Sequence, residues 1–521
     1  MTVQPGNAMN GSGTLTVALP DEAASEAFGR SLAMFLKAGD LILLQGDLGA
    51  GKTTIARALI RALAGDGELE VPSPTFTLVQ PYELSGLNVS HMDFYRLEDE
   101  AEAGELGLDE ALDTGVVIVE WPERAETALP QGALRICLNE EGVGRTALLS
   151  SPEPGWQERI ARMIAVDRFL DRAGWAGAIR HRIPGDASSR RYERLSAGPG
   201  GAAALLMDMP ARPDGPPVRG GKPYSRIANL AEDIRAVDAV NTQLIAQGYS
   251  APVIIAIDHA QGLALVEDFG STSFNSMIGD GKDISGPLNE AVALLADMAG
   301  RNWPASVSLS NGEAYPVPAY DRDALMIEAE LCLDWYWPYL VGTEPDDSVR
   351  DSFLAAWDKV LPLAKADHPV WVMRDFHVDN LFWLADRQGH ARIGLIDTQD
   401  CVLGHPAYDL ASLLLDVRVT FPKQVSDDYL DIYCALRAMA DDSFEEAAFR
   451  QAYAVLGAQR ATKILGIFAR LAKRDGKPGY LRFLPRTSEV LEICLRHPAM
   501  ADVRAWFDQH LPARLRDRGP A

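Results

Sequence analysis

A run of apolar residues, LILLQ (41–45), leads directly into the glycine-rich stretch GDLGAGKTT (46–54), and a segment with helical periodicity follows it. The stretch fits the pattern GxxxxGK[ST], whose glycines let the backbone curl until several N–H groups and a helix N-terminus face phosphate. A strand before it and a helix after it favour a phosphate-binding loop over a glycine-rich turn that matches by chance. We expect Lys52 to reach the β- and γ-phosphates of ATP and the Thr53 hydroxyl to ligate Mg²⁺. The predicted nucleotide-binding residues of this loop are Gly46, Asp47, Leu48, Gly49, Ala50, Gly51, Lys52, Thr53 and Thr54.

The chain has 521 residues, more than one hydrophobic core usually supports, so two or three domains are expected. The clearest boundary is LLSSPEPGW (148–156), where Ser, Pro and Gly interrupt the patterned sequence. Before it, apolar strands alternate with helical segments, which predicts an α/β domain with a mainly parallel sheet over residues 1–148. Residues 149–160 are predicted as a linker. After them, RRYERLS and AALLMDM predict a β-hairpin, and beyond about residue 271 the pattern is mostly helical.

Charge and cysteine content narrow the class of protein. The formal net charge is −24, and residues 1–150 hold 23 acidic against 9 basic residues, so strong direct nucleic-acid binding is not expected. The five cysteines are scattered and form no CxxC pair, which favours free thiols in a reducing compartment over disulfides or a zinc site. The N-terminus lacks the features of a signal peptide, and no apolar run approaches the length of a membrane span. We therefore expect a cytoplasmic protein without membrane association.

A second polar motif, MRDFHVDN (373–380), stands in the C-terminal half, and the strand-like stretches LFWL and RIGLI follow it around the turn ADRQGHA. An antiparallel hairpin brings the residue before its first strand beside the residue after its second, so Asn380 and Asp397 are expected to converge as oxygen ligands for Mg²⁺. Asp375, on the preceding loop, is placed to accept a hydroxyl proton during phosphoryl transfer. The alternative is three unrelated polar loop residues, and the D-x4-N spacing with a downstream acid favours the kinase-type site.

Three motifs follow the phosphate-binding loop in order, namely VPSPTFTLV (71–79), HMDFYRL (91–97) and VEWPER (119–124). With these motifs, residues 15–148 resemble the TsaE-type ATPases of the bacterial tRNA threonylcarbamoyladenosine machinery. The resemblance implies a nucleotide-sensing switch in SPTFT, a Walker-B-like acid and a second magnesium ligand followed by a tryptophan. The residues that match these roles are Ser73, Thr75, Thr77, Asp93, Glu120 and Trp121.

Some of these residues have other interpretations. Trp121 could equally be a core residue, and Asp93 could cap the turn that follows it. Glu120 closes the apolar stretch GVVIVE, which is where open α/β sheets place ligand groups. The resemblance also implies docking on threonylcarbamoyl-transferase complex proteins that hold the tRNA, so an acidic ATPase needs no basic groove of its own.

Residues 160–515 resemble the aminoglycoside phosphotransferase and choline kinase superfamily, whose fold is that of protein kinases. More narrowly, GDASSRRYERL, YDLASLLLD and QRATKILGIFARLAKRDGKPGYL resemble the AmgK-type kinases. The resemblance implies phosphorylation of N-acetylmuramate and N-acetylglucosamine at the anomeric hydroxyl, in cell-wall recycling. The expected fold is a bilobal, protein-kinase-like α+β domain, with an N-lobe over residues 161–270 and a mainly helical C-lobe over residues 271–521.

The kinase resemblance also implies a loop over the ATP phosphates and a hinge in LVEDFG (265–270) that receives adenine through backbone groups. The sequence departs from the superfamily at Met373, where a His is common, and in lacking a Lys on the strand AALLMDM. We hypothesise that Arg190 or Arg191 supplies the missing positive charge. The predicted nucleotide-binding residues of this half are Gly185, Asp186, Ala187, Ser188, Ser189, Arg190, Arg191, Glu267 and Asp268.

Other polar residues near the second motif have smaller expected roles. Asp400 is a candidate contact for a sugar hydroxyl, and Asp375 is a candidate contact for the hydroxyl that is phosphorylated. Asp409 is expected to cap or brace a helix, and a contact with substrate is the alternative. His377 and Asp379 are expected to brace the catalytic loop by hydrogen bonds.

The leading interpretation is a bifunctional fusion of an ATPase subunit for tRNA modification and a sugar kinase, with ATP and Mg²⁺ as the cofactors of both halves. An alternative for the first half is a nucleotide-gated scaffold for partner proteins with negligible turnover. For the second half, the alternatives are kinases for an aminoglycoside, choline or another small alcohol.

Overall fold

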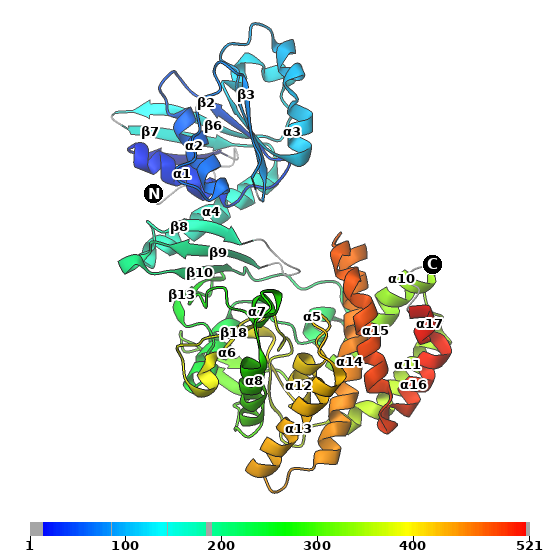
Figure 1. Cartoon of the computed structure of the whole chain (residues 1–521). Helices are drawn as coiled ribbons and strands as arrows, with labels where there is room; N and C mark the ends of the chain where they lie inside the picture. Colours follow the sequence, from blue (N-terminus) through cyan, green and yellow to red (C-terminus); the bar gives the residue numbers. More distant parts are fainter. Residues whose placement is uncertain (1–13, 85, 143, 184–189, 517–521) are drawn as a thin grey trace. The chain divides into compact units, whose positions relative to one another are not determined.

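The computed structural model describes residues 14–84, 86–142, 144–183 and 190–516, so the predicted phosphate-loop residues Gly185, Asp186, Ala187, Ser188 and Ser189 lie outside the described residues. The chain divides into two compact units, Met1–Asp208 and Met209–Ala521. Figure 1 traces the helices and strands of each unit in chain order.

The first unit contains a seven-stranded sheet in the order β1-β7-β6-β2-β5-β4-β3. Its four central strands run parallel, because β2 pairs in parallel with β5 and β6, and β4 pairs in parallel with β5. The outer pairs β1–β7, β6–β7 and β3–β4 are antiparallel. The predicted α/β domain is thus confirmed, with its parallel strands at the centre of the sheet. The strands are β1 Thr14–Leu19, β2 Leu41–Gln45, β3 Val79–Tyr82, β4 Asn88–Asp93, β5 Gly115–Glu120, β6 Leu134–Glu141 and β7 Gly144–Ser150.

The helices of this sheet domain are α1 Glu22–Ala33, α2 Lys52–Ala64 and α3 Leu108–Thr114. All six residues of β5 are buried, as expected for a central parallel strand covered on both faces. Helix α1 packs closely on α2 at Gly29, where a Cβ would stand 2.8 Å from the Ile55 carbonyl oxygen. Since α2 begins at the phosphate-binding loop, this contact joins α1 to the nucleotide site.

The first unit continues with α4 (Pro154–Arg172) and the antiparallel strands β8 Ile179–Ile183, β9 Arg191–Ser196 and β10 Ala204–Asp208. The predicted hairpin of RRYERLS with AALLMDM is β9 and β10. Residues 154–160 of the predicted linker form the start of α4, and Trp156 and Ile160 are buried there. Proline is favoured in the first turn of a helix, so Pro154 begins α4 instead of interrupting regular structure.

The second unit is mainly helical, with two-residue to five-residue strands between the helices (Figure 1). The strands are β11 Pro217–Arg219, β12 Lys222–Pro223, β13 Ile254–Asp258, β14 Leu263–Val266, β15 Ser306–Ser308, β16 Ala314–Pro316, β17 Val370–Val372, β18 Leu381–Trp383, β19 Ile393–Leu395 and β20 Val402–Gly404. The helices are α5 Tyr224–Ile227, α6 Arg235–Ala246, α7 Phe274–Gly279, α8 Ser285–Met298, α9 Arg322–Ala329, α10 Trp337–Val341, α11 Asp347–Val360, α12 Ala407–Leu414, α13 Lys423–Ala440, α14 Glu446–Lys473, α15 Leu484–Leu495, α16 Ala501–His510 and α17 Ala513–Arg516.

Helix α14 is the central helix of this unit. It has 28 residues, most of them buried, and it packs against α9, α12 and α15. Such a helix, covered on several sides, can place polar side chains deep in the unit as well as apolar ones.

The segment between β12 and Gly248 forms two helices, α5 and α6. The chain turns between them at Asn229, which has a φ of 53° and donates from Nδ2 to the Ala319 carbonyl oxygen at 2.8 Å. Gly248 has a φ of 91°, the left-handed conformation expected after a helix C-terminus.

All five cysteines are free thiols. No helix in the described ranges combines the length and the apolar character that crossing a membrane would need.

Candidate active sites

The phosphate-binding loop connects β2 to α2 and depends on its glycines. Gly46 has a φ of 147°, and a Cβ there would stand 2.7 Å from the Leu138 carbonyl oxygen, so a side chain cannot be accommodated. Gly49 and Gly51 also have positive φ values, 82° and 98°. The Gly49 carbonyl oxygen accepts a hydrogen bond from Arg145 Nη2 on β7 at 3.1 Å. The glycines and this hydrogen bond therefore hold the loop in a specific curled conformation, which a glycine-rich turn that matched the pattern by chance would not need.

Lys52 lies inside this curl. Its ammonium donates to the carbonyl oxygens of Gly46 (2.6 Å) and Asp47 (2.9 Å) and lies 3.7 Å from the ring centroid of Trp121. Burial lowers the pKa of Lys52, while Glu120 and other nearby acids oppose that shift. Trp121 is half-buried and also contacts Tyr95, so it is a wall of the lysine site and not simply a core residue.

Glu120 connects the loop to the end of the sheet. Its Oε2 accepts from Thr53 Oγ1 at 2.9 Å, and its Oε1 lies 2.9 Å from His91 Nε2. A hydroxyl and a carboxylate in contact match the one or two protein ligands that Mg²⁺ takes beside nucleotide phosphates. The pairing of Thr53 with Glu120 thus fits the predicted metal site. His91 was not predicted; it lies two residues before Asp93 on β4, and therefore on the same face of the strand.

The predicted switch meets Asp93, which is adjacent to Glu120 in the parallel pairing of β4 and β5. Asp93 Oδ2 accepts from Ser73 Oγ (3.1 Å) and Thr75 Oγ1 (2.7 Å), and Oδ1 accepts from the Tyr95 N–H (2.9 Å). Asp93 thus caps the following turn and also contacts two residues of the predicted switch. Thr77 is exposed and lies outside this cluster.

In the second unit, the predicted hairpin is formed by β18 and β19, with Leu381 opposite Leu395. The Ile396 N–H donates to the Asn380 carbonyl oxygen at 3.1 Å, which places Asn380 and Asp397 at the same end of the hairpin. Asn380 Nδ2 donates to the Asp375 carbonyl oxygen at 3.0 Å, so Oδ1 is the atom of Asn380 able to ligate a cation. Asn380 and Asp397 therefore offer the oxygen donors that Mg²⁺ prefers.

Asp375 is half-buried on the loop before this hairpin. Burial alone would raise its pKa, but the neighbouring His377, Lys463, Arg460 and Arg374 outweigh burial and hold the pKa of Asp375 at about 2. Burial lowers the pKa of His377 itself to about 3, so the lasting positive charges near Asp375 are those of the lysine and the two arginines. An ionised carboxylate in this position can accept a proton from a hydroxyl.

Asp409 directly braces the loop that carries the predicted base, Asp375. Its carboxylate accepts the backbone N–H groups of Met373 (2.6 Å) and Arg374 (2.9 Å). We expected Asp409 to cap or brace a helix; it lies on α12, but its partners are on the loop. This contact anchors the loop where related kinases commonly have a His and this chain has Met373.

A cluster of buried charged side chains close to the Asp375 loop was not predicted from the sequence. Arg374, which is 2% exposed, pairs with Glu328, and Lys463 Nζ lies 2.7 Å from the same carboxylate. These partners come from α9, the catalytic loop and α14, so no local sequence pattern joins them. Lys463 belongs to QRATK, which matched AmgK-type kinases without indicating a role.

Four of the six non-glycine residues with positive φ in the described ranges adjoin the two sites. They are Leu78 (63°), Trp121 (59°), Arg374 (68°) and Asp397 (59°). Such a conformation costs on the order of 1–3 kcal/mol in a residue with a side chain and is retained where surrounding structure imposes it. Backbone strain therefore marks the same two regions as the motifs do.

The remaining predicted residues of the second unit have protein partners. Asp400 Oδ1 accepts from the Ala231 N–H at 2.7 Å, and Asp379 forms an ion pair with Arg418 at 2.9 Å. Glu267 pairs with Arg387, and its N–H donates to the Val253 carbonyl oxygen at 2.9 Å. Asp268 Oδ1 accepts from the Gly270 N–H at 2.8 Å and so shapes the turn after the predicted hinge. Roles for these residues in binding adenine or sugar stay predictions.

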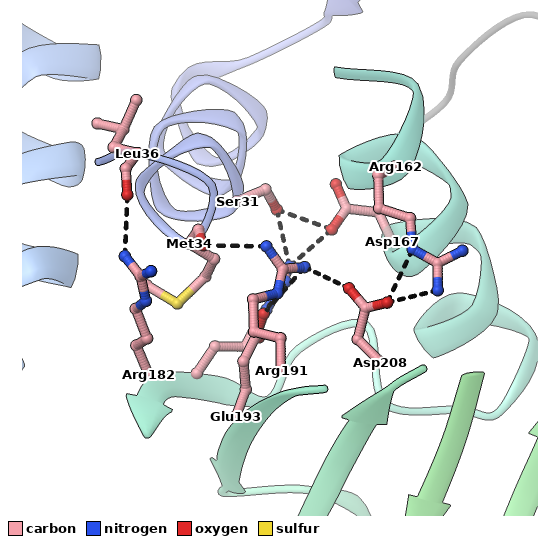
Figure 2. A network of polar contacts seen from close by, with 10 residues as sticks. Ser31, Met34, Leu36, Arg162, Asp167, Arg182, Arg191, Glu193 and Asp208 are labelled. Atoms are coloured by element: carbon pink, nitrogen blue, oxygen red, sulfur yellow. Dashed lines mark hydrogen bonds and ion pairs between the residues drawn. The ribbon is translucent and has the colours of Figure 1, made fainter. Parts of the chain in front are cut away.

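Arg191 has partners within the first unit. Its guanidinium donates to Asp208 Oδ2 (2.7 Å) and to the Met34 carbonyl oxygen (3.3 Å) at the end of α1, as Figure 2 shows. Asp208 also accepts from Arg162 Nε at 2.9 Å. Arg191 thus takes part in a polar network, and a contact from Arg190 or Arg191 to ATP stays a prediction.

Comparisons with known proteins match the two halves separately. The family described as "Threonylcarbamoyl adenosine biosynthesis protein TsaE" matches residues 19–147, and the "Phosphotransferase enzyme family" matches residues 179–448. The N-acetylmuramate/N-acetylglucosamine kinase of Caulobacter vibrioides is 37% identical over 366 residues, which cover 68% of this chain and 98% of that protein. The kinase of the same name from Pseudomonas putida is 30% identical over 325 residues, 61% of this chain and 84% of that protein. The Bacillus subtilis tRNA threonylcarbamoyladenosine biosynthesis protein TsaE is 44% identical over 124 residues, 24% of this chain and 75% of that protein.

These matches agree with the two sites described above, since the loop of Lys52 falls in one matched range and the loop of Asp375 in the other. The chain therefore belongs to the TsaE family of ATPases in its N-terminal part and to the phosphotransferase enzyme family of ATP-dependent small-molecule kinases in its C-terminal part.

Proposed function

We propose that this protein is bifunctional: its N-terminal ATPase supports threonylcarbamoyladenosine modification of tRNA, and its C-terminal kinase phosphorylates the anomeric hydroxyl of N-acetylmuramate and N-acetylglucosamine. The observation that carries the kinase half is the ionised Asp375 beside the hairpin that holds Asn380 and Asp397. The name and 37% identity of the Caulobacter vibrioides kinase support the choice of sugar. On this proposal the products enter cell-wall recycling, and both halves act in the cytoplasm.

In the kinase half, Asp375 accepts the proton of the sugar hydroxyl as its oxygen attacks the γ-phosphorus of ATP and the bond to the β-phosphate oxygen breaks. Asn380 and Asp397 would hold Mg²⁺, which neutralises phosphate charge when bound. Asp409 fixes the backbone of Met373 and Arg374 and thereby positions the loop that carries Asp375.

In the ATPase half, Thr53 and Glu120 would hold Mg²⁺, and Lys52 would exchange its carbonyl partners for phosphate oxygens. Ser73 and Thr75 connect the switch to Asp93 beside this site, so a change at the nucleotide can reach the switch. We propose the threonylcarbamoyl-transferase complex as the partner of this half.

A phosphate-transfer screen tests the kinase proposal. The wild-type protein, with ATP and Mg²⁺, is offered N-acetylmuramate, N-acetylglucosamine, aminoglycosides and choline, and Asp375→Ala serves as the blank. Transfer to the two acetylated amino sugars is expected. Transfer to an aminoglycoside or choline alone would contradict the proposed substrate while leaving the kinase family in place.

A second candidate for the N-terminal half is a nucleotide-gated scaffold. The specific observation behind it is the exposure of Leu48 (78%) on the phosphate-binding loop and Phe76 (81%) on the switch, which suits contact with a partner. ATP hydrolysis measured with and without the threonylcarbamoyl-transferase proteins separates the two, because a scaffold would bind nucleotide without turnover in either case.

Protonation of the base Asp375 should cause no loss of kinase activity on the acid side of neutral pH. The pKa of Asp375 is about 2, below the ordinary value of 3.8. Its carboxylate therefore stays ionised as the pH falls, until the pH itself approaches about 2. We expect kcat with the neutral sugar N-acetylglucosamine to be flat with respect to this base from about pH 5 to about pH 8. An acid limb near pH 6 that moves in Asp375→Glu would contradict this assignment.

A further inference from the structure

Arg460 is a buried cation close to the kinase site that has no ion-pair partner. It is 5% exposed on α14, at the centre of the second unit (Figure 1). Within the described ranges, no carboxylate lies within ion-pair distance of its guanidinium, and its side chain has no hydrogen bond or ring contact. The neighbouring cations differ, because Arg374 and Lys463 both pair with Glu328.

Arg460 is near the reacting end of the kinase site. Its charge acts on the carboxylates of Asp375 and Asp409 and on the ring of His377. The geometry agrees, because Arg460 lies three residues before Lys463 on α14 and so on the same side of the helix. Lys463 contacts Glu328, which pairs with Arg374, the residue next to the proposed base. Asp375, Asn380 and Asp397 are each only half-buried, so this end of the site is open to a ligand.

Withdrawing a guanidinium from water costs several kcal/mol unless a partner replaces the water. A planar guanidinium donates two parallel N–H bonds to a carboxylate, which makes it a specific receptor for that group. A buried, unpaired arginine beside a hydroxyl-phosphorylating site thus suits a substrate that brings its own carboxylate. The two proposed sugars differ in this group, because N-acetylmuramate carries a carboxylate and N-acetylglucosamine does not.

We infer that Arg460 binds the carboxylate of N-acetylmuramate and determines how strongly the kinase prefers this acidic sugar over neutral N-acetylglucosamine. The inference rests on the proposed sugar-kinase function and adds the residue that distinguishes the two sugars. Two other roles make different predictions. An arginine that touches the transferring phosphoryl group would affect kcat with both sugars. One that only balances the charges of Asp375 and Asp409 would affect folding.

The test compares Arg460→Gln and Arg460→Lys with the wild-type protein on both sugars. Arg450→Gln is the matched control, because Arg450 lies on the same helix but pairs with Asp431 and Glu446 at the surface. We expect Arg460→Gln to raise KM for N-acetylmuramate by about 10- to 100-fold, with KM for N-acetylglucosamine within about twofold. Arg460→Lys should raise KM for N-acetylmuramate less than Arg460→Gln does, because lysine keeps the positive charge but lacks the planar guanidinium.

A parallel loss with both sugars, an unchanged KM for N-acetylmuramate, or a fall in melting temperature that accounts for the loss would each overturn the inference. A second measurement does not depend on the variant folding: the wild-type protein should use the methyl ester of N-acetylmuramate about 10-fold less efficiently than the free acid. Equal use of ester and acid would also overturn it. Absence of wild-type transfer to either sugar would instead overturn the proposed function.

Discussion

Replacing Asp375 with asparagine is expected to lower kcat of the proposed sugar kinase by about 10²- to 10⁴-fold, the range that a positioned general base contributes. The amide has nearly the shape of the carboxylate but cannot accept the hydroxyl proton. The nearby cations hold the pKa of Asp375 at about 2, so the wild-type carboxylate is ionised at the pH of the assay. KM for ATP should change little, because Asn380 and Asp397 remain in place.

Asp386→Asn is the matched control for this prediction. Asp386 lies in the turn of the same hairpin and is exposed, so its loss should leave kcat unchanged. Initial rates of sugar phosphorylation under saturating ATP and sugar measure both variants. If Asp375→Asn kept more than about a tenth of the wild-type kcat, Asp375 would not be the base.

The second large effect is expected in the first unit, where Arg180→Ala should destabilise the protein by about 3–5 kcal/mol. The Arg180 side chain is 8% exposed and pairs with two acids, the half-buried Asp167 at 2.7 Å and the buried Glu193 at 2.6 Å. Ser31 Oγ, on α1, donates to the same Asp167 carboxylate at 2.9 Å. Removing the guanidinium would leave the buried Glu193 and the half-buried Asp167 without their main counter-charge.

This network also joins α1 to the elements around β9, as Figure 2 shows for Ser31, Asp167 and Glu193. Amide hydrogen exchange can therefore locate the effect, and the free energy of opening should fall in both α1 and β9. Arg30→Ala is the control, because Arg30 forms an exposed pair with Glu26 that contributes little to stability. Two results would show that the network does not join α1 to β9. One is a change in the free energy of unfolding below about 1 kcal/mol in Arg180→Ala, and the other is a loss of hydrogen-exchange protection confined to β9.

The sequence predicted the parts of each site that lie close together along the chain. Gly46 to Thr54 form one loop, and Asn380 and Asp397 are brought together by a single hairpin, so strand and turn patterns were sufficient. Asp93 and Glu120 lie 27 residues apart but end adjacent parallel strands, which is a regular property of such sheets. The predicted residues are thus the ones whose neighbours follow from secondary structure.

The parts that escaped prediction depend on packing between distant segments. Glu328 and Arg374 are 46 residues apart, and Met373 and Asp409 are 36 residues apart. Their partners are chosen by how α9, α12 and α14 pack, and burial of a charge leaves no periodic signal in the sequence. The start of α4 was not predicted for a local reason, because Pro154 and Gly155 are typical of a linker. In the structure, Trp156 and Ile160 are buried on one face of this helix.

The central claim is that the chain has two independent sites for magnesium-bound nucleotide. The most direct test is the stoichiometry with which a non-hydrolysable ATP analogue and Mg²⁺ bind the full chain in a calorimetric titration, for the wild-type protein and for Lys52→Ala. We predict two nucleotides bound per wild-type chain and one per Lys52→Ala chain, with sugar phosphorylation by that variant unchanged. A single nucleotide per wild-type chain, or loss of sugar phosphorylation in Lys52→Ala, would contradict the claim.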